Sequence, residues 1–128
     1  MRELGSSQPT AVELEILRIL WELGPSPVRS IHARLAEAKG TNYSTTVKML
    51  SVMLAKGLVK RDDNAVPQIW RAAMTRDRAA KRFLSELIEK VYEGSAMSLV
   101  LQALAGGSAS KAEIDEARKL LDAMEGKS

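Results

Sequence analysis

The sequence of 128 residues contains no cysteine and only one histidine, His32. Without cysteine the chain can form neither a disulfide nor a thiolate metal site, and it has no cysteine nucleophile. One histidine is also too few for a histidine metal cluster. We therefore expect no metal site and no cofactor, and we place His32 on the surface without a chemical role.

Long apolar runs and catalytic motifs are missing as well. No apolar run approaches the roughly 20 residues that a bilayer-spanning helix needs, and residues 1–8 lack the apolar region of a signal peptide. The GxSxG, Walker A, GxGxxG and HExxH patterns are absent. We expect a cytoplasmic protein with no membrane insertion, no catalytic residues and no enzymatic activity.

The net charge of +3 is unevenly placed. Residues 28–61 contain seven basic residues and one acidic residue, a net charge of +6. Residues 76–128 contain nine of each and are neutral. A basic part next to a neutral part indicates one region that binds a polyanion and another with a different task.

One predicted helix has a clear start and a clear end. Asn42 is a favourable N-cap, because its side chain can accept a hydrogen bond from the first turn. Gly57 is a favourable C′ residue, because glycine adopts a positive φ without a Cβ penalty. Four side chains between them recur at helical spacing and predict a buried face: Thr46, Met49, Leu50 and Met53.

The opposite face of this helix is polar and carries no acidic residue. It consists of Ser44, Thr45, Lys48 and Ser51. Hydroxyl groups and a cation can bond to base edges and phosphates in the major groove of DNA. These residues alone equally allow an ordinary amphipathic helix, so the neighbouring elements have to decide.

Those elements predict a winged helix over residues 9–74, after a loose tail at residues 1–8. Thr10 and Glu13 form a capping box for a first helix, and a second helix begins at Val28. Strands at residues 58–61 and 69–72 form a hairpin after the third helix. This order is that of a winged helix-turn-helix. The expected core includes Leu14, Leu17, Leu20, Trp21, Ile31, Leu35 and Leu50.

Residues 75–128 are predicted to be helical, which makes the fold mainly α with a small β-hairpin. The helix at residues 96–105 is apolar nearly all round, so it needs a second protein surface. A symmetric homodimer is the commonest solution, and folding back onto the N-terminal domain is the alternative. The expected dimer interface is Phe83, Leu87, Leu99, Val100, Leu101, Leu104, Ile114 and Leu121.

Five stretches carry a resemblance to a known family. They are TAVELEILRILW (10–21), YSTTVKML (43–50), KGLVKR (56–61), IWRA (69–72) and YEGSAMSLVLQAL (92–104). In this order and at this spacing they resemble the penicillinase-repressor family of winged-helix transcriptional regulators. The resemblance extends over nearly all of residues 8–126.

The resemblance implies a dimeric repressor that binds a double-stranded DNA operator with inverted-repeat half-sites. It places Ser44, Thr45, Val47 and Lys48 at the DNA and Arg71 on the wing. The helical region at 75–128 corresponds to the dimerisation region. The full set of expected DNA contacts is Tyr43, Ser44, Thr45, Val47, Lys48, Ser51, Lys60 and Arg71.

Three positions depart from the family pattern. Val52 stands where many members have a basic residue, and the wing tip at residues 65–67 lacks the usual glycine and basic residue. Gln102 and Ala103 replace the Asn-Phe pair that is cleaved in the founding members. Release through an upstream sensor and protease therefore stays open, as does a link to β-lactams. The copper-responsive branch has cysteine ligands that this chain lacks.

A different function uses the same fold. A winged helix can serve only as a protein-interaction module, without reading DNA. The charge of +6 over residues 28–61 and the acid-free helix face favour DNA.

Overall fold

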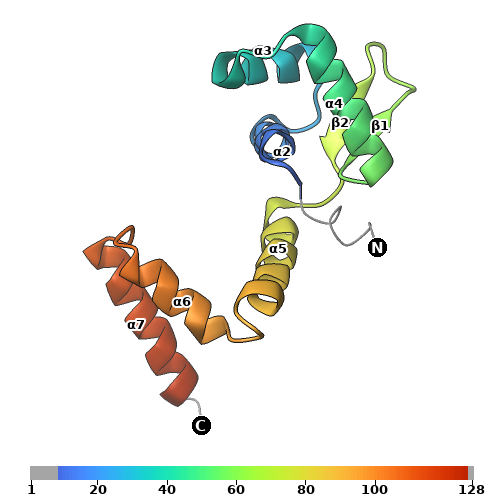
Figure 1. The fold of residues 1–128 in the computed structure, drawn as a ribbon. Coiled ribbons are helices and arrows are strands. Elements are labelled where there is room, and N and C mark those ends of the chain that lie inside the picture. The colour runs from blue at the N-terminus through green and yellow to red at the C-terminus, as the bar shows by residue number, and fades with distance from the viewer. Residues whose placement is uncertain (1–8, 127–128) are drawn as a thin grey trace. The chain divides into compact units, whose positions relative to one another are not determined.

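The computed structural model describes residues 9–126, and the expected tail at residues 1–8 lies outside this part. The chain divides between Phe83 and Leu84 into two compact units. The first unit contains three helices, a hairpin and the start of a fourth helix (Figure 1): α2 (Ala11–Leu23), α3 (Val28–Lys39), α4 (Tyr43–Lys56), β1 (Val59–Asp62), β2 (Ile69–Ala72) and α5 (Arg76–Val91). The second unit contains the rest of α5 and two further helices, α6 (Ala96–Ala105) and α7 (Lys111–Gly126). The fold is mainly α with a small β-hairpin, as predicted.

The helix boundaries follow the capping residues. The Glu13 N–H donates to Thr10 Oγ1 at 3.2 Å, and the Thr10 N–H donates to Glu13 Oε1 at 2.9 Å, which completes the predicted capping box. In α4 the Thr45 N–H donates to the side chain of Asn42 at 2.9 Å. The helix ends at Gly57, whose φ of 82° is the left-handed conformation that glycine adopts most easily.

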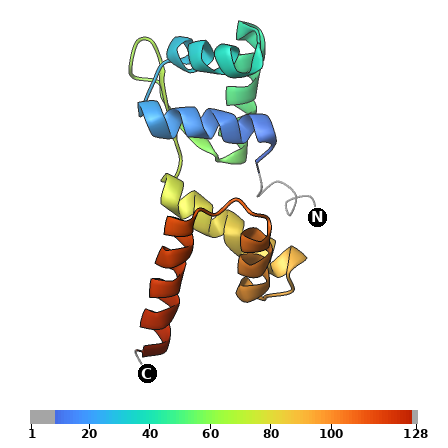
Figure 2. The ribbon, with the colours of Figure 1, turned by 90° about the vertical axis from the view of Figure 1, so that its left-hand side faces the viewer.

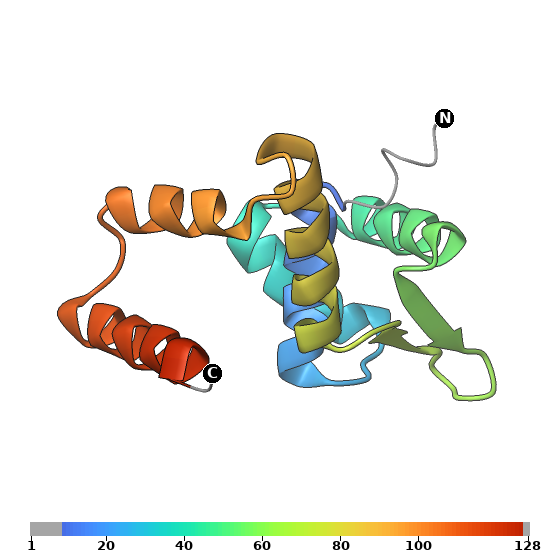
Figure 3. The same ribbon diagram turned by 90° about the horizontal axis from the view of Figure 1, so that it is seen from below.

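The hairpin begins one residue later than predicted. The Leu58 N–H donates to Met53 O at 2.9 Å, so Leu58 completes the end of α4 and β1 starts at Val59. The strands are antiparallel, with Lys60 opposite Arg71. In Figure 3 the loop between them extends away from the helices of the first unit.

A short third segment extends this sheet on the side of β2. The Ser26 N–H donates to Trp70 O at 2.9 Å, and the Trp70 N–H donates to Ser26 O at 2.8 Å. Ser26 lies between α2 and α3, two helices that pack side by side (Figure 2). The pairing therefore holds the turn between these helices against the hairpin.

The core of the first unit confirms most of the predicted core but not the predicted face of α2. Leu14 is 37 % exposed, whereas Ile16 and Ile19 are buried. Glu13, which is 2 % exposed, lies on the same inward face as these two residues and has a basic partner. Trp21 is partly buried and donates from Nε1 to Met74 O at 3.0 Å. The core cluster consists of Ile16, Leu17, Ile19, Leu20, Ile31, Leu35, Leu50, Met53, Leu58, Val59 and Trp70.

The second unit has no comparable core. Neither α6 nor α7 buries a single residue. Ser95 caps α6 by accepting from the Ser98 N–H at 3.0 Å, and Ser110 accepts from the Glu113 N–H at 3.1 Å at the start of α7. These helices are therefore defined by their caps and their intrinsic propensity, and most of their apolar side chains are exposed.

Candidate nucleic-acid interface

The buried side of α4 determines which of its side chains face outward. Thr46, Leu50 and Met53 are fully buried. At about 100° per residue, Ser44, Lys48 and Ser51 fall within roughly 60° of one another on the opposite side. All six α4 residues that the sequence assigned to DNA are exposed: Tyr43, Ser44, Thr45, Val47, Lys48 and Ser51. We call α4 the recognition helix.

The first turn of the recognition helix is held in place by its cap. The side-chain oxygen of Asn42 accepts from the Thr45 N–H and from Ser44 Oγ, the latter at 3.1 Å. The Ser44 hydroxyl is thus oriented by the cap, and its oxygen keeps lone pairs for a further donor. The cap therefore fixes the start of the helix and one hydroxyl on its exposed face.

His32 is not the isolated surface residue that the sequence suggested. It is partly buried, and its Nδ1 lies 2.9 Å from Thr46 Oγ1 on the recognition helix. Its ring also meets Tyr43 edge-on, with centroids 5.2 Å apart. His32 therefore connects α3 to the first turn of the recognition helix. Thr46 and Tyr43 follow His32 by 14 and 11 residues, so no local sequence pattern predicts these contacts.

The cations of the hairpin, which we call the wing, differ in their surroundings. Lys60 and Arg71 are exposed, lie directly opposite each other and make no ion pair within residues 9–126. Like charges in this position repel each other, and a phosphate group placed between them would relieve the repulsion. Arg61 instead lies 5.5 Å from the ring centroid of Trp70 and pairs with Asp63. The structure thus brings the two predicted wing contacts together.

Lys56 is a basic residue of the recognition helix that is already paired. Its Nζ lies 2.9 Å from each carboxylate oxygen of Glu13, which is almost completely buried. The sequence predicted Glu13 only as a capping residue, and this ion pair was not predicted. The two residues are 43 positions apart, so no helical spacing connects them.

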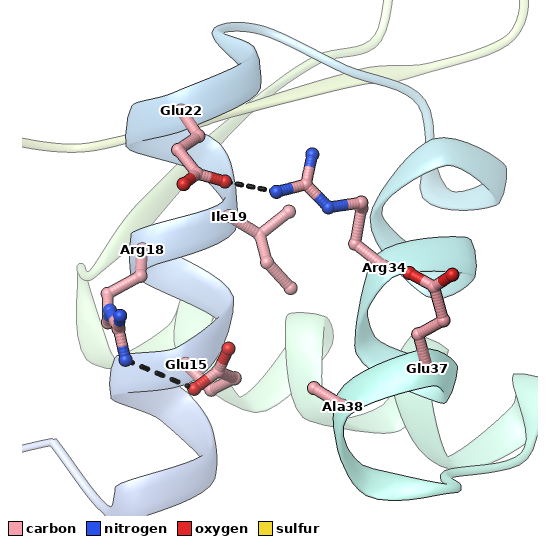
Figure 4. A pocket seen from close by; sticks show the side chains of 7 residues that line it. All are labelled: Glu15, Arg18, Ile19, Glu22, Arg34, Glu37 and Ala38. Carbon is pink, nitrogen blue, oxygen red and sulfur yellow. Dashed lines mark hydrogen bonds and ion pairs between the residues drawn. The ribbon is translucent and has the colours of Figure 1, made fainter.

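Arg34 is also neutralised by a carboxylate. Figure 4 shows its guanidinium directed at Glu22 across a groove of about 410 Å³ between α2 and α3. No residue of the recognition helix or the wing lines this groove. Within the described chain, four of the seven cations in residues 28–61 make no ion pair: Arg29, Lys39, Lys48 and Lys60.

The residues expected at a dimer interface lie on α5, α6 and α7. Phe83 and Leu99 are partly buried, and the other six are exposed. Leu101 is 60 % exposed and Leu121 46 % exposed, which is unusual for leucine in a stable helix. The remaining four are Leu87, Val100, Leu104 and Ile114. Met97, Leu120 and Met124 add further exposed apolar area that the prediction did not include.

The described residues contain neither a candidate metal site nor a candidate membrane-spanning helix. Between residues 9 and 126 no three carboxylate, histidine or cysteine side chains gather where they could hold a metal ion. No helix in the same range is long and apolar enough to pass through a bilayer.

Three helices, a two-stranded wing and an exposed polar face on the third helix define the first unit as a winged helix of the kind found in transcriptional regulators. Residues 9–123 match the family model described as penicillinase repressor. The chain belongs to the penicillinase repressor family, as the resemblance predicted. The family description is that of a repressor, a class of transcriptional regulator.

A solved structure of a MarR family transcriptional regulator from Silicibacter pomeroyi DSS is also similar to the chain. The two share 18 % sequence identity over 99 % of this chain and 76 % of the other, with a TM-score of 0.48. No curated protein matches the sequence.

Proposed function

We propose that the chain is a repressor that binds an inverted-repeat DNA operator as a homodimer. The observation that carries this proposal is the placement of unpaired cations. Lys48 lies on the acid-free face of the recognition helix, and Lys60 and Arg71 form a like-charged pair on the wing. A polyanion with regularly spaced phosphates satisfies all three groups at once.

The two elements have different tasks in this proposal. The recognition helix enters the major groove, where Ser44, Lys48 and Ser51 reach base edges and Val47 contacts an apolar group such as a thymine methyl. The wing binds the backbone through Lys60 and Arg71, which sets the orientation but not the sequence preference. Tyr43 and Thr45 flank the base-reading side chains.

Dimerisation through the second unit completes the proposal. The exposed leucines of α6 and α7 leave more apolar surface in water than a monomer usually tolerates. A two-fold axis through these helices would bury each contact twice and present two winged helices to two half-sites. Each half-site then raises the effective concentration of the other subunit at its own site.

The test is a titration of the purified protein with the DNA upstream of its own gene. Fluorescence anisotropy should show tighter binding to this fragment than to random DNA of equal length, and footprinting should reveal two symmetric protected half-sites. Analytical ultracentrifugation of the free protein should give a dimer. Equal affinity for both fragments would favour the alternative, a winged helix that serves only as a protein-interaction module.

A further inference from the structure

We propose that the Glu13–Lys56 ion pair positions the recognition helix and the wing for DNA binding, so that Lys56 is a positioning residue and not a phosphate contact. The proposal rests on the proposed function, because positioning matters only if these two elements bind DNA. It assigns a role in DNA reading to α2, a helix that carries no expected DNA contact.

The geometry of the pair is well defined. Lys56 Nζ lies 2.9 Å from both oxygens of Glu13, and Glu13 Oε1 also accepts from the Thr10 N–H at 2.9 Å. The carboxylate is 2 % exposed, and the Lys56 side chain is 26 % exposed. The first turn of α2 thus fixes the carboxylate, and the carboxylate in turn fixes the ammonium group.

Because of the position of Lys56 in the fold, this ion pair can hold two elements at once. Lys56 is the last residue of the recognition helix, and only Gly57 and Leu58 separate it from β1. The Leu58 N–H returns to Met53 O, so these two linking residues are themselves tied to the helix. One ion pair therefore holds both the end of the recognition helix and the beginning of the wing.

The direction of Lys56 also separates it from the DNA-facing residues. It follows Lys48 by eight positions, which at about 100° per residue turns it by roughly 80° around the helix. This rotation brings Lys56 to the side of the helix that meets α2. The charge of Lys56 is neutralised by the carboxylate of Glu13, and burying that carboxylate without a cationic partner would be strongly unfavourable.

The experiment removes both charges together. In Glu13→Gln/Lys56→Met the side chains keep similar volumes, and no buried charge is left without its partner. The double variant should stay folded, with a urea midpoint slightly below that of the wild type, because the new amide N–H groups at position 13 lack an acceptor. Its affinity for the operator should fall roughly tenfold, because a loosely held recognition helix loses its fixed register.

Two further readouts separate positioning from direct contact. Affinity for random DNA and the slope of log K against log salt should stay unchanged, since no phosphate contact is lost. Hydrogen exchange at the Gly57 and Leu58 amides of the free protein should become faster. Glu13→Gln alone keeps the acceptor for the Thr10 N–H and weakens the interaction with Lys56. It should therefore show a smaller loss of operator affinity and a smaller increase in hydrogen exchange.

The exposed pair Glu22–Arg34 supplies the matched control. It also joins α2 to another helix, but its carboxylate is not buried: the side chain of Glu22 is 66 % exposed and that of Arg34 42 % exposed. Glu22→Gln/Arg34→Met should leave operator affinity and salt slope at their wild-type values. An equal loss of affinity in this control would assign the effect to general loosening of α2 and would overturn the proposal.

Two other results would also overturn it. One is unchanged operator affinity in a stably folded Glu13→Gln/Lys56→Met protein, or in Glu13→Gln where the double variant does not fold. The other is a salt slope lowered by about 0.9 for each subunit, which would make Lys56 a phosphate contact. Failure of the proposed function is distinct from both, because the wild-type protein itself would then show no preference for the operator.

Discussion

His32 and Thr46 join α3 to the buried side of the recognition helix through a hydrogen bond of 2.9 Å between Nδ1 and Oγ1. Thr46 Oγ1 also lies 3.4 Å from Asn42 O and donates to it. The histidine tautomer sets which of Nδ1 and Oγ1 donates in the first bond. The arrangement links the histidine, the threonine and the cap of the recognition helix in one chain of hydrogen bonds.

Thr46→Val should destabilise the first unit by about 1–3 kcal/mol, because it leaves His32 Nδ1 without its buried partner. Urea unfolding followed by tryptophan fluorescence measures the change. Thr45→Val is the control, since Thr45 is exposed and next in sequence; its effect should stay within about 0.5 kcal/mol. Equal effects of the two substitutions would show that the His32 contact contributes nothing.

Lys48→Ala should weaken operator binding by about 1–3 kcal/mol, because a side chain that reaches a base edge contributes on this scale. The loss should be smaller on random DNA. The measurement is anisotropy titration on both fragments at one salt concentration. Lys111→Ala, an exposed cation at the start of α7, should have no effect on either fragment. Unchanged operator binding in Lys48→Ala would mean that the wrong helix has been assigned to the groove.

Arg71→Ala should weaken binding to operator and random DNA alike, because a wing residue that touches only phosphate carries no sequence information. The slope of log K against log salt should decrease by about 0.9 for each subunit. Arg61→Ala is the comparison within the same hairpin. Arg61 is held by Trp70 and Asp63, so its removal should lower the free energy of unfolding and leave the salt slope as it is.

Leu101→Asp should dissociate the dimer while the winged helix stays folded. A carboxylate in an apolar interface carries a large desolvation penalty, and Leu101 belongs to a unit separate from the N-terminal core. Analytical ultracentrifugation should give a monomer. Binding to the full operator should fall far more than binding to a single half-site.

Lys119→Glu in α7 provides the comparison for Leu101→Asp, because it also adds a carboxylate to the second unit but at an exposed polar position. It should remain dimeric. A Leu101→Asp protein that still sediments as a dimer would show that α6 does not lie at the centre of the interface.

Zinc, copper(II) and mild oxidants at micromolar concentration should not change the affinity for DNA. The chain has no cysteine, and residues 9–126 contain no cluster of metal ligands. The measurement is operator titration with and without each reagent, and with a chelator as the reference. Release of DNA by one equivalent of metal per subunit would contradict this prediction.

The local features of the fold followed from the sequence because they depend on near neighbours. The Thr10–Glu13 box, the Asn42 cap and the Gly57 stop use residues within a few positions of one another. The buried face of the recognition helix followed from its spacing alone. The order of helices and strands was then sufficient to predict the winged helix.

The features that were missed depend on contacts between distant residues. A buried charged residue such as Glu13 is an exception to the usual burial of apolar residues, and its carboxylate is satisfied by the distant Lys56 as well as by the Thr10 N–H. The buried face of α2 includes Ile16 and Ile19, so Leu14 was wrongly placed in the core. Likewise, no sequence pattern around Ser26 predicts its backbone pairing with Trp70.

The assignment of DNA contacts and dimer contacts stays a prediction. The structure shows that these side chains are exposed or partly exposed, as a contact with DNA or with a second subunit requires. The pairing of Arg34, Lys56 and Arg61 with carboxylates refines the prediction, because a charge count along the sequence treats every cation as free.

These three neutralised cations have a consequence for how the protein finds its operator. Binding to random DNA comes almost entirely from phosphate neutralisation by free cations. Because three of the seven cations in residues 28–61 are paired, the lifetime of the protein on non-operator DNA should be shorter at physiological salt than the net charge of this segment suggests. We therefore expect the search to proceed mainly by repeated diffusion through solution, with only brief one-dimensional sliding between encounters.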